Sequence, residues 1–307
     1  MNPMPRTKAY ADVVRAYSKR ARAIEMFDPE LVIIFAPDHY TGIHLEMVPP
    51  FCVGYAATAV DDYGGTPGRL NVPGDLARAC LAAVRARDID IAASHEMIVD
   101  HGFSQPLRLL SGELDRYSTI PIFINTTCRP LSTFRRIRQL GEAVGDFAVK
   151  LGMRVAFIAS GGLSHHPANI FPQDIDAASP ELRDYLVHGG ALGGLNREAW
   201  IAFLGERTEL GGQMVVRGER TASDFRLNPE WDRDFLKLMT KGDYTVFDDW
   251  DADWVVEQAG VAAMEVQQWV CAASAAKVCG TGKFVTDFYY SGAEYRLAIG
   301  VAHAAAS

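Results

Sequence analysis

The 307-residue chain is poor in cysteine, in net positive charge and in long apolar runs. Its five cysteines are odd in number and form no Cys-x-x-Cys pair, which fits reduced thiols better than a disulfide framework or a zinc knuckle. The formal net charge of −8 argues against a nucleic-acid surface. No run is long enough to span a bilayer, and the first residues contain no apolar segment of the kind that directs export. These features predict a cytoplasmic protein without a membrane or nucleic-acid partner.

Several catalytic motifs are also missing. The sequence contains no Gly-x-Ser-x-Gly nucleophile elbow, no Gly-x-x-x-x-Gly-Lys phosphate loop and no Gly-x-Gly-x-x-Gly turn. The pair His95-Glu96 lacks the second histidine of a zincin helix. The remaining chemistry that suits the histidines and carboxylates is a metal held by imidazole and carboxylate, with further histidines for proton transfer.

Apolar segments alternate with amphipathic ones over the first half of the chain. Strands are expected at Leu31–Ala36, Asp88–Ser94, Ile120–Asn125 and Arg154–Ala159, and helices at Thr7–Phe27, Gly74–Ala86 and Arg135–Leu151. The alternation predicts an α/β fold with a mainly parallel central sheet and helices on both faces. Residues 47–55 are expected to be loop and edge structure, and 61–73 an exposed loop.

The second half of the chain has a different character. Helices are expected at 234–240 and 255–278, and late strands at 284–290 and 295–301. We therefore expect a single domain, with a sheet core at about 1–170 and 283–307 and a helical segment at about 171–282 that covers the site.

The stretch Met153–Pro167 organises the candidate site. Its apolar strand runs into Gly161 and Gly162, and Ser164, His165 and His166 follow at once. Open α/β sheets bind ligands at the carboxyl edge of their strands, so this stretch predicts an imidazole in a binding crevice. A glycine turn with two solvated histidines is the alternative.

Two further histidines occupy similar positions. His39 follows the strand Leu31–Ala36, and His101 follows Asp88–Ser94 within a short polar stretch. With His165 they make three histidines at separate strand ends of one sheet, and these are expected to converge on one rim.

Five short motifs in order resemble the class III extradiol ring-cleavage dioxygenases. They are Asp38-His39-Tyr40, Met47–Phe51, Val99–Phe103, Gly161–His165 and Leu227–Asp232. The resemblance implies cleavage of a catechol with an acidic side chain, such as 2,3-dihydroxyphenylpropionate, by O₂ in aromatic catabolism. An ortho-aminophenol substrate and a metal-poor subunit that supports a catalytic partner are the alternatives. The resemblance also implies that the protein forms a homo-oligomer.

The resemblance implies roles for individual residues. Non-haem Fe(II) would be held by two histidines and one carboxylate. His39 matches one metal histidine and Glu265 the carboxylate, with Glu294 as the alternative. His101 and His165 match the acid–base pair. The remaining matches imply that Asp38, Tyr40 and Ser164 contact the substrate, while Asp100 either orients a histidine ring or caps a loop.

The sequence departs from the family at its beginning. The family starts with an apolar strand and a Ser-His-Ser-Pro-like turn, whose histidine is the other metal ligand. Aligned on Phe27-Asp28-Pro29, the chain begins at Met1 just after that turn. A late start codon is the favoured explanation, and loss of the iron chemistry is the alternative. The 307-residue chain is expected to bind iron weakly and to have little activity.

Overall fold

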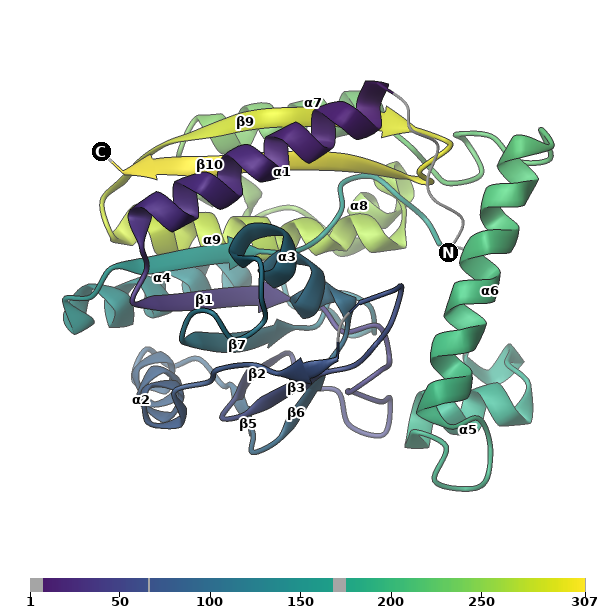
Figure 1. The fold of residues 1–307 in the computed structure, drawn as a ribbon, viewed down its shortest axis with the longest axis horizontal. Helices are drawn as coiled ribbons and strands as arrows, with labels where there is room; N and C mark the ends of the chain where they lie inside the picture. The colour runs from purple at the N-terminus through teal and green to yellow at the C-terminus, as the bar shows by residue number, and fades with distance from the viewer. Residues whose placement is uncertain (1–7, 66, 168–174, 307) are drawn as a thin grey trace.

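A five-stranded sheet lies at the centre of the protein (Figure 1). The computed structural model describes residues 8–65, 67–167 and 175–306. The strands lie in the order β5 (Ala92–Ser94), β2 (Phe51–Gly54), β7 (Thr119–Ile124), β1 (Leu31–Ala36), β8 (Val155–Ala159). β7 and β8 pair in parallel with β1, β5 pairs in parallel with β2, and only the β2–β7 pair is antiparallel. The predicted α/β class with a mainly parallel sheet is therefore confirmed.

The two faces of β1 belong to two different cores, because successive side chains of a strand point to opposite faces. Leu31, Ile33 and Phe35 pack in the core formed with α2 (Gly74–Arg85), α4 (Phe134–Leu151) and α9 (Val266–Val278). Val32 and Ile34 pack in the core formed with α3 (His101–Ser111) and a three-stranded sheet. That smaller sheet has the order β4 (Gly68–Arg69), β3 (Ala57–Ala59), β6 (Met97–Val99). The continuous apolar run in β1 thus reflects burial on both faces.

An outer layer lies beyond these cores. The antiparallel hairpin of β9 (Thr281–Gly292) and β10 (Leu297–Ala306) runs beside α1 (Lys8–Phe27) (Figure 1). Both strands of the hairpin contact α1. α7 (Pro229–Thr240) packs against β9. In the described part of the chain, no helix has both the length and the apolar character needed to cross a membrane.

The second half of the chain is largely helical. Besides α7 and α9 it contains η1 (Ile175–Ala177), α5 (Pro180–His188), α6 (Arg197–Val216), η2 (Tyr244–Phe247), α8 (Ala252–Ala259) and η3 (Val261–Glu265). α5 and α6 stand at one end of the molecule, beyond the carboxyl ends of the strands (Figure 1). The boundary expected near residue 170 between the sheet core and the helical segment falls outside the described residues, and the single-domain organisation remains a prediction.

One expected helix differs from the structure because of local backbone conformation. The helix expected at 255–278 is interrupted at Gly260, whose φ of 93° does not fit a right-handed helix. Residues 261–265 form η3 before α9 begins. This interruption matters for the site, because it places Glu265 at the junction where η3 ends and α9 begins.

Two further differences concern strands. Residues 51–54, expected in loop and edge structure, form the fully buried strand β2 within the sheet. The strand expected at 88–94 is limited to 92–94, and β6 follows at 97–99 in the smaller sheet. β2, β5 and β6 are only three or four residues long, so they offer too few positions for a periodic pattern.

Candidate active site

Three histidines gather near the carboxyl ends of the strands. His39 follows β1 and His165 follows β8, while His101 opens α3 directly after β6. The expectation that all three end strands of one sheet is therefore wrong, because β6 belongs to the smaller sheet. The rings of His39 and His101 stack with centroids 4.3 Å apart and planes at 19°. Tertiary packing of the two sheets brings them together.

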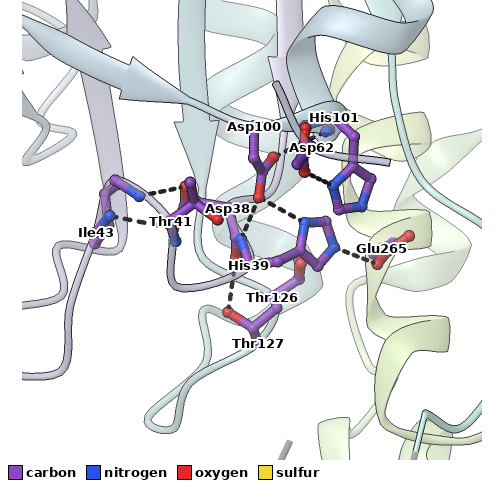
Figure 2. A network of polar contacts seen from close by, with 12 residues as sticks. Asp38, His39, Thr41, Ile43, Asp62, Asp100, His101, Thr126, Thr127 and Glu265 are labelled. Atoms are coloured by element: carbon purple, nitrogen blue, oxygen red, sulfur yellow. Dashed lines mark hydrogen bonds and ion pairs between the residues drawn. The ribbon is translucent and has the colours of Figure 1, made fainter. Parts of the chain in front are cut away.

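Asp100 holds the ring of His39 (Figure 2). Its Oδ2 accepts hydrogen bonds from the backbone N–H of His39 at 2.7 Å and from Nδ1 of the ring at 2.9 Å. Its Oδ1 accepts from the backbone N–H of Gly102 at 2.8 Å and caps α3. Asp100 thus both caps a helix and orients a ring, but the ring is that of His39 and not that of its neighbour His101.

Charge keeps Asp100 ionised although it is fully buried. Burial opposes ionisation, but His39 and His101 hold the pKa of the Asp100 carboxyl well below its ordinary value. Burial also acts to lower the pKa of His39, yet Asp100 and Glu265 raise it well above its ordinary value. The pair therefore favours a carboxylate beside an Nδ1–H group.

Asp62 holds the ring of His101 as Asp100 holds that of His39. Asp62 was not identified from the sequence. The segment 61–73 was expected to be exposed, but Asp62 is only 1% exposed. Its Oδ2 accepts from the backbone N–H of His101 at 3.1 Å and makes a short hydrogen bond with Nδ1 of the ring. Nothing in the sequence distinguishes Asp62 from the adjacent Asp61, which is exposed.

The glycine turn after β8 sets the position of His165. Nδ1 of His165 donates to the carbonyl oxygen of Leu163 at 2.8 Å, because that oxygen can only accept. Gly161 has a φ of 144°, and a Cβ there would lie 2.6 Å from Cβ of Glu265. The turn therefore needs glycine at 161 to bring the backbone against Glu265.

Glu265 lies between two of the histidines. Its Oε1 is 3.4 Å from Nε2 of His39 and 3.9 Å from Nε2 of His165, and its Oε2 accepts from the backbone N–H of Gly162 at 2.7 Å. Burial would raise the pKa of Glu265, but its hydrogen bond to His39 and the charge of His165 lower it. A buried carboxylate facing two imidazoles suits a cation, either a proton or a metal ion.

The hydrogen-bond partners place a proton on Nδ1 in all three rings. In each, Nδ1 faces a carboxylate or a carbonyl oxygen, which can only accept a proton. Nε2 is then the unprotonated nitrogen of the neutral ring. In its neutral form each ring thus offers an Nε2 lone pair, and Nε2 of His39, which faces Oε1 of Glu265, needs a proton or a metal ion between the two atoms.

Two groups of residues in the described part of the chain could hold a metal ion. His39, Asp100 and His101 offer ligand atoms within 4.8 Å of one another. However, both Asp100 oxygens already accept hydrogen bonds. His39 and Glu265 form the better pair, because Nε2 of His39 faces Oε1 of Glu265 and Asp100 supports the imidazole from behind.

The expected substrate contacts take different positions. Asp38 is 3% exposed, and its carboxylate accepts from the backbone N–H groups of Thr41, Gly42 and Ile43. Burial and the nearby Asp100 raise the pKa of Asp38 to about 7. Tyr40 is half-buried and donates to the carbonyl oxygen of Thr127 at 3.4 Å. Asp38 therefore organises the loop after β1.

Ser164 is fully buried and belongs to a polar network. Its backbone N–H and its hydroxyl donate to the two oxygens of Asp232, each at 2.8 Å, and its hydroxyl accepts from the backbone N–H of Asn228. Tyr289 donates to Asp232 at 2.8 Å. The network joins the turn before His165 to α7 and β9.

Two other residues, Glu294 and His166, clarify the sequence-based assignments. Glu294 accepts from the hydroxyl of Tyr290 at 2.5 Å, and none of its hydrogen bonds reaches the three histidines. His166, expected to be solvated, is 9% exposed and accepts from the backbone N–H of Val261, so that expectation is wrong. Burial lowers the pKa of His166.

Comparisons with known proteins agree with this geometry. The family description "Catalytic LigB subunit of aromatic ring-opening dioxygenase" matches residues 1–298. A protein of Cupriavidus pinatubonensis named 2,3-dihydroxyphenylpropionate/2,3-dihydroxicinnamic acid 1,2-dioxygenase is 39% identical over 98% of this chain and 93% of its own length. A Rhodococcus protein of that name is 40% identical with the same coverage. A Pseudomonas putida protein named 2,3-dihydroxyphenylpropionate/2,3-dihydroxicinnamic acid 1,2-dioxygenase 2 is 42% identical over 91% of this chain and 85% of its own length.

Proposed function

The chain belongs to the family of catalytic LigB subunits of aromatic ring-opening dioxygenases, and from this premise we propose that it cleaves a catechol bearing an acidic side chain. Membership makes it a metal-dependent enzyme that acts on a small aromatic molecule and O₂. The observation that carries the proposal is the convergence of His39 and His165 on Glu265, with His101 stacked on His39.

The donor atoms fit Fe(II), which we propose as the metal. Imidazole nitrogen with carboxylate oxygen is the donor set of non-haem Fe(II) oxygenases. His39 would bind through Nε2, since Asp100 holds Nδ1, and Glu265 would bind through Oε1. These two residues occupy two of the three positions of the expected triad. When bound, Fe(II) would supply the Lewis acidity and the electrons that activate the diol and O₂.

We assign the proton transfers to the other two histidines. His101 accepts a proton from a diol hydroxyl at Nε2, and the Asp62 carboxylate stabilises the imidazolium that forms. His165 holds a proton at Nε2 beside Glu265 and delivers it to oxygen as the ring opens.

The substrate proposal comes from the relatives. Their printed names specify 2,3-dihydroxyphenylpropionate and the corresponding cinnamic acid, and we propose a substrate of this class. An ortho-aminophenol is the second candidate within ring opening. A supporting role without catalysis is disfavoured, because the matching family is that of the catalytic subunit. Assembly as a homo-oligomer remains a prediction.

The function is tested by mixing the protein, Fe(II), 2,3-dihydroxyphenylpropionate and air-saturated buffer. We expect equal amounts of O₂ to be consumed and of yellow ring-opened product to be formed, and this stoichiometry is the test whatever the rate. Consumption of O₂ without the ring-opened product would contradict ring cleavage. Turnover of 2-aminophenol in preference to the catechol would contradict the proposed substrate.

The metal assignment has a matched control. Glu265→Ala should lose most of the bound iron, because it removes one of the two proposed protein ligands, and even the loss of a supporting partner costs about 10- to 100-fold in affinity. Glu294→Ala removes a carboxylate bonded to Tyr290 and should retain wild-type iron content. Iron per chain after desalting distinguishes the two, and the reverse order would assign the ligand to Glu294.

A further inference from the structure

Arg296 is a half-buried cation that has no acidic partner among the described residues. It lies in the turn between β9 and β10 at a φ of 59°, which non-glycine residues rarely adopt. Its Nη1 donates to the backbone carbonyl oxygen of Thr208 in α6, and its Nε is buried without a hydrogen-bond partner. Among the residues that the structure describes, no carboxylate forms an ion pair with this guanidinium.

A cation in this position is costly unless an anion joins it, because burial removes water from the charge. Burial lowers the pKa of Arg296, and Tyr63 is the neighbour whose charge opposes that effect. The nearest acidic residue in the sequence is Glu294, and its carboxylate accepts a hydrogen bond from Tyr290. The backbone bond to Thr208 uses one of the five N–H donors of arginine.

Tyr63 connects Arg296 to the active site. Its ring meets the ring of His101 edge-on, with centroids 4.7 Å apart and planes at 81°. Its hydroxyl accepts a hydrogen bond from Oγ1 of Thr208 at 3.3 Å. The backbone carbonyl oxygen of the same Thr208 accepts the hydrogen bond from Arg296. Gly211, one turn further along α6, has no side chain, and a Cβ there would lie 3.0 Å from Nη1 of Arg296. The guanidinium therefore stands one tyrosine side chain away from the histidine that faces the diol.

The negative charges around the histidines would oppose binding of an anionic substrate unless a cation such as Arg296 received it. Asp62, Asp100 and Glu265 are all buried carboxylates at the site. An anionic side chain on the substrate would be repelled by them unless a positive group received it. A guanidinium binds a carboxylate through two parallel N–H donors, which fixes orientation as well as charge.

We propose that Arg296 binds the carboxylate of the substrate's side chain and selects acidic catechols over uncharged ones. This proposal rests on the function proposed above, and it makes Arg296 a specificity-determining residue. A purely structural role, in which Arg296 fastens the β9–β10 turn to α6, would use the backbone bond to Thr208 alone. Such a role would affect every substrate equally.

The test compares 2,3-dihydroxyphenylpropionate with 3-ethylcatechol, which has the same diol but no carboxylate. The variants are Arg296→Gln, Arg296→Lys and, as a control, Arg207→Gln. Arg207 also lies on α6, is exposed, and stacks on Phe203, so its substitution removes the same charge away from the site. The kcat and KM of each compound and the dissociation constant of each in the absence of O₂ are measured.

We expect Arg296→Gln to lower the ratio of kcat/KM for the acid to that for 3-ethylcatechol by about 10- to 100-fold, the range of one hydrogen bond between charged groups. The change should lie in KM and in the anaerobic dissociation constant of the acid. Arg296→Lys keeps the charge but loses the paired donors, so the ratio should fall by a smaller factor of about 3 to 10. Arg207→Gln should keep the wild-type ratio.

The failures of the two proposals are separable. If the wild type cleaves neither compound, the proposed function fails, and the anaerobic dissociation constants alone decide the role of Arg296. An Arg296→Gln protein that discriminates as well as the wild type, in turnover or in binding, overturns the subsite. If that variant does not fold, Arg296→Lys provides the decision, because an unchanged ratio there also overturns it.

Discussion

Replacing Asp62 with asparagine tests whether the proton acceptor depends on a carboxylate that the sequence did not reveal. Asp62 is 1% exposed and accepts from both the backbone N–H and Nδ1 of His101. An asparagine has nearly the same shape, but its amide nitrogen donates. If that nitrogen faces Nδ1, the ring proton moves to Nε2, the atom that must accept the proton of the diol.

The size of the effect follows from the bond that is lost. A hydrogen bond to a charged group contributes about 1.5–3 kcal/mol. At about 1.4 kcal/mol for each factor of ten in rate, the loss lowers kcat by about 10- to 150-fold. Iron content should stay at the wild-type level, because Asp62 contacts neither His39 nor Glu265 in its hydrogen bonds.

The assay is the initial rate of ring-opened product, measured with iron content and with the ¹⁵N shifts of the His101 ring. The shifts report the tautomer whether or not the enzyme turns over. Asp61→Asn is the matched control, because Asp61 is the exposed neighbour with the same charge. A kcat for Asp62→Asn within threefold of the wild type, with Nδ1 still protonated, would refute the reasoning.

Two other expectations concern proton transfer and pH. His101→Phe and His165→Phe should each lower kcat by about 100- to 10,000-fold at near-normal iron content, and wild-type turnover in either variant would remove that residue from the mechanism. Burial raises the pKa of Asp232, so the folded protein holds this proton more tightly than the unfolded chain. The stability that results is present below about pH 4 and is lost as pH rises through the folded-state pKa, so the wild type should lose stability relative to Asp232→Asn over that interval. Urea unfolding of both proteins at a series of pH values measures the difference, and a difference that is independent of pH would contradict the assignment.

The sequence by itself indicated the fold class and the gathering of three histidines near the carboxyl ends of strands. The continuous apolar run of β1 predicted a strand buried on both faces, and it occupies that position in the sheet. The glycines after β8 predicted a turn that presents a histidine, and His165 does lie beside Glu265. These inferences succeeded because they depend on short stretches of chain, where residue type and local conformation are directly coupled.

Only the tertiary structure decided which carboxylate supports which histidine. Asp100 is adjacent to His101 in sequence, yet its Oδ2 binds the ring of His39, while His101 binds Asp62 from a loop 39 positions earlier. Glu265 reaches the site because Gly260 ends α8 and a short helical turn follows. Arg296 meets α6 through a turn between two strands. Such pairings depend on the directions of side chains that come from separate elements, and residue spacing along the chain carries no information about them.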